Sequence, residues 1–122
     1  MISRPSNKEL FNKIRDGKES IEQGEIQIID LAIIAEDAAE LGYRTENLQK
    51  VLSTILDEIG IDNYVGAHPP RKSYEQIIKD CELLEFSWVS RRLGCDVYLK
   101  YCLKGGIFYL VSLHRDRPKT PH

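Results

Sequence analysis

The last third of the chain carries residue types that could cleave RNA. The stretch DVYLK at 96–100 contains Tyr98 and Lys100, and the stretch LVSLH at 110–114 ends in His114. When an RNA 2′-hydroxyl attacks the adjacent phosphate, the reaction needs a base, cations for the charge on phosphorus, and an acid for the leaving oxygen. Histidine can serve as acid or base, lysine can hold a phosphate, and tyrosine can orient a phosphate oxygen or stack on a base.

Arginines close to these strands add candidates for holding the phosphate, because a guanidinium can bind two phosphate oxygens at once. Arg115 and Arg117 follow the second stretch, and Arg91 and Arg92 lie in the SRRLG turn ahead of the first. Each candidate also has a plainer interpretation. Strand tyrosines and lysines are often solvated, a histidine at a strand end can bond the backbone, and charged turn residues commonly face water.

The register of the last hairpin decides whether the three candidate side chains share a face, because side chains alternate along a strand. With a two-residue turn at Gly105-Gly106, Tyr98 lies opposite Leu113 and His114 is on the other face. With a three-residue loop, Tyr98 faces His114, and Lys100 shares their surface. We favour the second register because it separates polar from apolar residues, as a one-sided sheet requires. The side chains that then face the helices are Val97, Leu99, Tyr101 and Leu103.

The first half of the chain is predicted to be helical. One helix covers 7–22, and a short extended piece after Gly24 leads into a second helix over 30–41. Asp30 is the predicted N-cap of this second helix, and Gly42 is predicted to stop it. A third helix is predicted to begin with Thr45 as its cap and to end at Gly60 in a left-handed conformation. Apolar residues three and four apart along this third segment indicate one buried stripe.

The second half changes to the alternating pattern of strands. A short helix is predicted over 74–81, and three antiparallel strands follow it. The strands cover 84–90, 96–103 and 107–113. Helices followed by strands predict an α+β fold with the N-terminal helices packed on one face of a small C-terminal antiparallel sheet. We expect a single domain over 1–122, in which 1–62 is mainly helical and 84–114 forms the sheet.

Composition excludes several classes of protein. No stretch approaches the length of a membrane span, and the N-terminus has no hydrophobic signal core, so a cytoplasmic protein is expected. The three cysteines lack CxxC spacing and are interpreted as reduced thiols, which argues against a zinc site. They are Cys81, Cys95 and Cys102. No phosphate-binding glycine loop or HExxH motif is present, and no cofactor is expected.

Charge is distributed unevenly along the chain. The net charge is −2, but residues 1–62 carry seven Lys or Arg against thirteen Asp or Glu, a net charge of −6. Residues 63–122 carry ten against six, a net charge of +4. A basic second half can form a local anion site, although ordinary surface variation explains the difference equally well.

Several short motifs resemble one family of toxins. An aromatic-x-aromatic pattern at 86–88, DVYLK at 96–100, and LVSLH at 110–114 after a glycine turn are similar to the C-terminal half of MqsR-type toxins. These toxins belong to the RelE-like superfamily of bacterial messenger-RNA interferases. GEIQ at 24–27 and ELGY at 40–43, each ahead of a helix, extend the similarity over most of the chain after residue 8.

The resemblance implies a metal-independent endoribonuclease, the toxin of a type II toxin–antitoxin pair, with RNA and an antitoxin protein as partners. In the family, a tyrosine and a lysine of the penultimate strand and a basic residue closing the last strand belong to the cleavage site. They correspond to Tyr98, Lys100 and His114, and a loop lysine of the family corresponds to Lys72. The family often has lysine at the last position and is usually basic overall. These two departures motivate the alternative of a non-catalytic protein- or nucleic-acid-binding module with the same fold.

Overall fold

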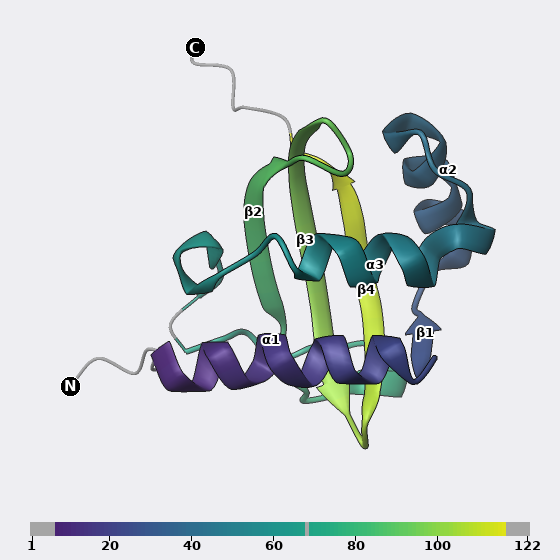
Figure 1. The fold of residues 1–122 in the computed structure, drawn as a ribbon. Helices are drawn as coiled ribbons and strands as arrows, with labels where there is room; N and C mark the ends of the chain where they lie inside the picture. Colours follow the sequence, from purple (N-terminus) through teal and green to yellow (C-terminus); the bar gives the residue numbers. More distant parts are fainter. Residues whose placement is uncertain (1–6, 68, 117–122) are drawn as a thin grey trace, which may run out of the picture.

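Three helices pack against one face of a four-stranded sheet in the computed structural model, which describes residues 7–67 and 69–116 (Figure 1). The helices are α1 (Asn7–Glu22), α2 (Leu31–Leu41) and α3 (Leu48–Leu56). The strands are β1 (Ile26–Ile28), β2 (Leu84–Ser90), β3 (Cys95–Lys104) and β4 (Ile107–Arg115). The predicted α+β class, with the helices ahead of the sheet, is therefore confirmed.

The sheet is mixed, although the sequence predicted only antiparallel strands. Its order is β1-β4-β3-β2, in which β2 and β4 run antiparallel to β3 and β1 runs parallel to β4. The extended piece before α2 thus becomes an edge strand. The Phe108 N–H donates to the Glu25 carbonyl at 2.8 Å, and the Ile29 N–H donates to the Leu110 carbonyl at 3.0 Å. These bonds hold β1 at the sheet edge, a long-range pairing that no local pattern shows.

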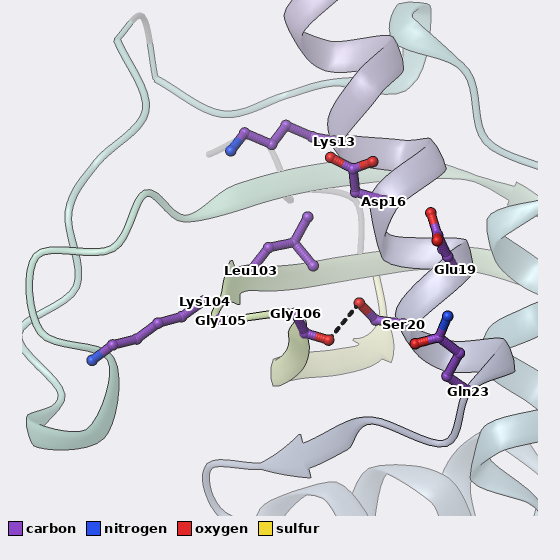
Figure 2. Close-up of a pocket in the computed structure, with 9 residues that line it drawn as sticks. All are labelled: Lys13, Asp16, Glu19, Ser20, Gln23, Leu103, Lys104, Gly105 and Gly106. Atoms are coloured by element: carbon purple, nitrogen blue, oxygen red, sulfur yellow. Dashed lines mark hydrogen bonds between the residues drawn. The ribbon is translucent and has the colours of Figure 1, made fainter.

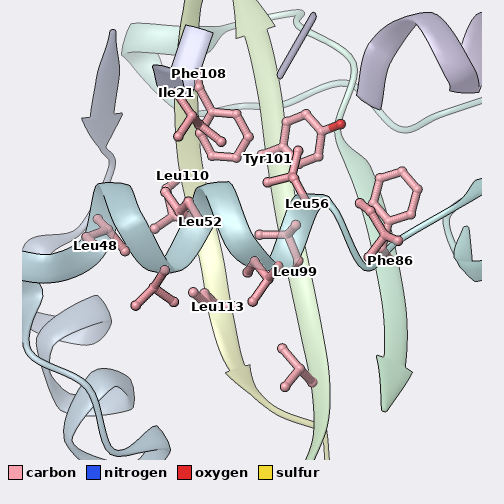
Figure 3. Close-up of a cluster of buried hydrophobic side chains, with 14 of the residues drawn as sticks. Ile21, Leu48, Leu52, Leu56, Phe86, Leu99, Tyr101, Phe108, Leu110 and Leu113 are labelled. Carbon is pink, nitrogen blue, oxygen red and sulfur yellow. The ribbon is translucent and has the colours of Figure 1, made fainter. Parts of the chain in front are cut away.

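Helices α1 and α3 lie across the sheet and fill the core from one side (Figures 1 and 3). Leu52, Ile55 and Leu56 of α3 are fully buried, as the predicted apolar stripe requires. Gly17 of α1 allows close approach, since a Cβ there would lie 3.3 Å from Leu56 Cδ2. Among the described residues, no helix is both long enough and apolar enough to cross a bilayer.

The residues that begin and end α2 were predicted correctly, and those expected to begin and end α3 were predicted wrongly. Asp30 Oδ1 accepts a hydrogen bond from the Ile33 N–H at 3.2 Å, and Gly42 follows the helix with φ 84°. Thr45 does not cap α3, because it begins a 3-10 turn (Thr45–Asn47) ahead of the helix. Gly60 is extended rather than left-handed, since α3 already ends at Leu56.

The helix predicted over 74–81 is reduced to a single 3-10 turn, Gln76–Ile78. The Ser73 hydroxyl accepts a hydrogen bond from the Glu75 N–H at 3.0 Å, so its side chain stabilises a turn instead of a helix. The backbone segments before and after this turn are joined by hydrogen bonds. The Ser73 N–H donates to the Cys81 carbonyl at 2.9 Å, and the Leu83 N–H donates to the Arg71 carbonyl at 2.7 Å. We call the segment 71–83 the ribbon.

The ribbon is anchored to the sheet face that the helices leave open. Ile78 is fully buried against Cys102 of β3 and Tyr109 of β4, which form a small second apolar cluster. The Lys104 ammonium donates to the Ile77 carbonyl at 3.2 Å. The ribbon therefore covers the open face near the hairpin turn, and the other end of that face carries polar residues.

The hairpin has the predicted pairing for a different reason. Lys104 pairs with Ile107 across a two-residue turn, in which Gly105 (φ 59°) and Gly106 (φ 78°) are both left-handed. A bulge between Lys100 and Tyr101 then shifts the register, leaving Val111 as the extra residue of β4. The predicted three-residue loop is thus wrong, but the bulge produces the same one-residue shift. Tyr98 pairs with His114 and Lys100 pairs with Ser112, as favoured above.

Candidate active site

Tyr98, Lys100 and His114 lie together on the open face of the sheet. The residues that alternate with them are fully buried toward the helices, so the three side chains point outward. These buried neighbours are Val97 and Leu99 on β3 and Leu113 on β4. The Tyr98 and His114 rings stack with centroids 5.0 Å apart. The Lys100 ammonium lies 5.9 Å from the Tyr98 ring centroid. An aromatic hydroxyl, an ammonium and an imidazole therefore form one partly exposed cluster.

The Tyr98 hydroxyl donates a hydrogen bond to Oε1 of Glu85, a neighbour on β2. Burial raises the pKa of Tyr98 well above its ordinary value, and Glu85 and Asp116 raise it further. The Arg71 guanidinium opposes these effects. Tyr98 consequently remains a phenol and a hydrogen-bond donor at neutral pH.

The His114 ring is oriented by the backbone. Nδ1 lies 2.9 Å from the Arg115 carbonyl oxygen. Because a carbonyl oxygen can only accept, Nδ1 carries the hydrogen, which leaves Nε2 as the nitrogen that can exchange a proton with a ligand.

The far end of the cluster is closed by a carboxylate. Asp116 accepts a hydrogen bond from the Ser87 hydroxyl, and its N–H donates to the Asp96 carbonyl at 2.9 Å. These contacts hold the segment after β4 across β3 and onto β2. The cluster thus contains two carboxylates, Glu85 and Asp116, beside its cations.

A groove of about 790 Å³ opens beside the cluster, between the ribbon and the sheet. Lys100 and Glu85 line it from the sheet, and Arg71 and Lys72 line it from the ribbon. The predicted loop lysine, Lys72, is therefore brought to the same groove as Lys100. Cations from two separate parts of the chain meet there, and as many carboxylates line the same groove, so it can pair with a ligand that carries both an anionic group and hydrogen-bond donors. The carboxylates are those of Glu75, Asp80 and Glu85.

Arg91 and Arg92 are held at a different place. They follow β2 in a turn where Glu58, just after α3, accepts a hydrogen bond from the Arg92 N–H at 2.9 Å. Glu58 also accepts from Trp88 Nε1 at 3.0 Å and from the Ser90 hydroxyl at 2.7 Å. Arg91 lines a separate hollow of about 420 Å³ together with Glu58. The structure does not bring these arginines to Lys100, and their turn has a structural explanation.

The last two predicted arginines lie beyond the cluster. Arg115 is exposed at the end of β4, where it pairs with Val97 and alternates with His114, so its side chain leaves the strand on the other face. Arg117 lies outside the described residues.

A second pocket, of about 320 Å³, lies at the hairpin turn beside α1 (Figure 2). The Ser20 hydroxyl donates to the Gly106 carbonyl at 2.8 Å on its wall. Lys13, Asp16 and Glu19 give it mixed charge, and none of the predicted site residues lines it. We therefore assign the candidate site to the cluster and groove on the open face.

Sequence reasoning missed Arg71, Glu85 and Asp116. Alternation along LEFSWVS places Glu85 and Ser87 on the face opposite Phe86 and Trp88, so Glu85 could have been found from the pattern. Arg71 and Asp116 lie outside regular strands, and only the tertiary structure brings them to Tyr98.

No protein-family model matches the chain, and no curated protein matches it. Within residues 7–67 and 69–116, no group of three or more His, Cys, Asp or Glu side chains is placed to hold a metal ion.

Proposed function

We propose that the chain is a metal-independent endoribonuclease, the toxin of a type II toxin–antitoxin pair acting in the cytoplasm. The observation that carries this proposal is the open-face cluster of Tyr98, Lys100 and His114 beside a groove to which Arg71 and Lys72 bring two further cations. The likeness of its strand motifs to MqsR-type toxins adds to this observation. A small acid–base cluster next to cations matches the needs of RNA transesterification.

The residues of the cluster can be assigned to the steps of the reaction. Tyr98 engages Oε1 of Glu85, so Oε2 is the oxygen that takes the proton from the RNA 2′-hydroxyl. The 2′-oxygen then bonds to phosphorus while the bond from phosphorus to the 5′-oxygen breaks. Protonated His114 gives a proton to the leaving 5′-oxygen through Nε2. The products are a 2′,3′-cyclic phosphate and a free 5′-hydroxyl, and no cofactor is consumed.

Cations stabilise the transition state in this assignment, and the phenol positions the base. Lys100 and Arg71 balance the charge that develops on the phosphoryl oxygens, while the Tyr98 hydroxyl stays hydrogen-bonded to Glu85 and orients its carboxylate. Lys72, farther along the groove, holds a neighbouring phosphate. The antitoxin in this proposal binds the first half of the chain, whose net charge of −6 suits a basic partner.

The test is an RNA-cleavage assay with the purified chain in the presence of EDTA, combined with induced expression in bacteria. Wild type is expected to cleave single-stranded RNA and to arrest growth. His114→Ala and Lys100→Ala are expected to lose about 100-fold or more of the cleavage rate. Arg92→Ala is the matched control, since it removes a cation from the separate turn and leaves the cluster intact. A wild-type chain that neither cleaves RNA nor slows growth would reject the proposal.

One observation favours the alternative, a binding module without catalysis. The Tyr98 phenol is already engaged by Glu85, and Asp116 adds a second negative charge beside the cations. A module of this kind would bind RNA or a protein partner through Lys72 and Lys100 and leave RNA intact. Binding without cleavage, with equal affinity for His114→Ala and wild type, would select this alternative.

A further inference from the structure

The groove beside the cluster has features that a phosphate site alone does not need. Its lining includes the apolar side chains of Leu83 from the ribbon and Val111 from β4. Val111 is the extra residue of the β-bulge, so the irregularity that sets the Tyr98–His114 pairing also supplies part of the groove. Apolar surface with charged groups around it is suited to a flat aromatic ligand that carries polar edges.

An aromatic side chain stands at the edge of this groove. Tyr74 lines the groove, is 97% exposed, and therefore has no packing role in the fold. The ribbon around it is fixed, because Ser73 is buried and its N–H bonds the Cys81 carbonyl at 2.9 Å. A ring presented to solvent from a tethered backbone resembles the stacking surfaces that bind single-stranded nucleic acids.

A carboxylate of the groove is held in an unusual backbone conformation. Asp80 has φ 67°, and among the described residues it is the one non-glycine with positive φ. Its N–H bonds the Ser73 carbonyl at 2.9 Å, which closes the turn across from Tyr74. Within the described part of the chain, its side chain makes no hydrogen bond or ion pair, so the carboxylate is available to a ligand. Strained residues of this kind are concentrated at functional sites.

We propose that this groove is a nucleobase-binding subsite for single-stranded RNA, in which a base stacks on Tyr74 and Asp80 accepts a hydrogen bond from its amino group. Adenine, cytosine and guanine carry such a group and uracil does not. Lys100 belongs to both the groove and the cluster, so the bound base belongs to a nucleotide adjoining the scissile phosphate. The inference rests on the proposed function for its substrate class and adds the determinant of base preference.

The experiment uses fluorescently labelled 2′-O-methyl hexanucleotides of adenine, cytosine or uracil, which lack the attacking hydroxyl and cannot be cleaved. Fluorescence anisotropy with the full wild-type chain is expected to show about tenfold tighter binding of the adenine and cytosine probes than of the uracil probe. Tyr74→Ala is expected to weaken all three by about tenfold, and Tyr74→Phe is expected to bind as wild type does.

Two further variants complete the test. Asp80→Asn tolerates the left-handed conformation and removes the charge, so it should abolish the preference over uracil. Phe11→Ala is the matched control, because Phe11 is an aromatic residue that is 61% exposed on α1, and affinities should not change. Equal wild-type affinity for all probes, no detectable binding, or unchanged affinity in Tyr74→Ala would overturn the inference.

The inference and the proposed function can fail separately. If unmodified RNA is not cleaved but Tyr74→Ala weakens the probes, the subsite stands and the nuclease proposal falls. If RNA is cleaved and Tyr74→Ala binds the probes as wild type does, the nuclease proposal stands and the subsite falls.

Discussion

Two tyrosines three residues apart on β3 have opposite surroundings. Tyr101 is fully buried under the helices, with ring centroids 4.5 Å from Phe108 and 6.0 Å from Phe86, and its hydroxyl donates to the Lys13 carbonyl at 3.1 Å. Tyr98 is partly exposed, stacks on His114 and donates to Glu85. One ring is surrounded by apolar side chains and a backbone acceptor, and the other by titratable groups. The comparison separates a residue that stabilises the fold from one that lies among titratable groups on an accessible face.

Burial raises the pKa of both phenols, so the shift alone does not distinguish them. The neighbours do. A hydroxyl that bonds a main-chain carbonyl satisfies a polar group in the core, as buried groups must be satisfied. A hydroxyl that bonds a carboxylate beside an imidazole and an ammonium belongs to a titratable network on an accessible face.

The largest expected effect is on stability, from truncation of the buried ring. Tyr101→Ala should lower the free energy of unfolding by about 3 to 5 kcal/mol, because it leaves a large cavity between Phe86 and Phe108. Tyr98→Ala should cost less than about 1 kcal/mol, since its ring is only partly buried. Urea denaturation followed by circular dichroism measures both. Equal losses of unfolding free energy in the two variants would show that Tyr98 stabilises the fold as much as Tyr101 does.

The next largest effect is on the pH dependence of stability and comes from Glu58, whose carboxylate accepts hydrogen bonds from the Arg91–Arg92 turn. Burial acts to raise its pKa, but hydrogen bonds from Ser90, Trp88 and the backbone N–H groups of the turn outweigh it, and the net pKa is lowered. The folded state therefore favours the carboxylate. Its contribution to stability is present above the ordinary carboxyl pKa and is lost as the pH falls through the lowered value.

Glu58→Gln should accordingly lower the free energy of unfolding at neutral pH by about 1 to 3 kcal/mol. The difference from wild type should shrink in acid, once the wild-type carboxyl is protonated. Denaturation curves over a pH series test this, and Glu46→Gln, at an exposed ion pair with Arg44, is the control. A difference that stays constant into acid would contradict the assigned role.

The smallest effects on stability are expected when a single hydroxyl group is removed from either tyrosine. Tyr98→Phe should reduce RNA cleavage by about tenfold, through the lost hydrogen bond to Glu85, and should leave stability within about 0.5 kcal/mol of wild type. Tyr101→Phe removes the same atom from the covered face and should cost about 1 kcal/mol of stability with no change in cleavage. Rates and unfolding curves from the same preparations provide the comparison. Slower cleavage by Tyr101→Phe together with lower stability of Tyr98→Phe would contradict the assigned roles of the two hydroxyls.

The fold could be predicted from the sequence where one segment carried its own signal. The bounds of α1 and α2, the stop at Gly42, and the strand 84–90 follow from periodicity and capping residues. The end of α3 could not be predicted from Gly60, because the chain leaves the helix at Leu56 and reaches the glycine in extended form. The pairing of β1 with β4 depends on contacts across about 80 residues and leaves no local pattern.

The pairing of Tyr98 with His114 was predicted correctly but through an incorrect turn. Separation of polar from apolar residues selected the Tyr98–His114 pair, and burial enforces that separation whether a longer loop or a bulge supplies the shift. The same reasoning could not place Arg71 or Asp116, because alternation informs only about residues within strands. Arg91 and Arg92 were grouped with the site by charge, but Glu58 holds their turn elsewhere.

The central claim is that the open-face cluster cleaves RNA by attack of the 2′-hydroxyl, and the ends of the products test it most directly. Mass spectrometry of a short RNA incubated with wild type in EDTA should show a 2′,3′-cyclic phosphate on one fragment and a 5′-hydroxyl on the other, and His114→Ala should yield neither. Intact RNA with wild type, or the same fragments at the same rate from His114→Ala, would contradict the account.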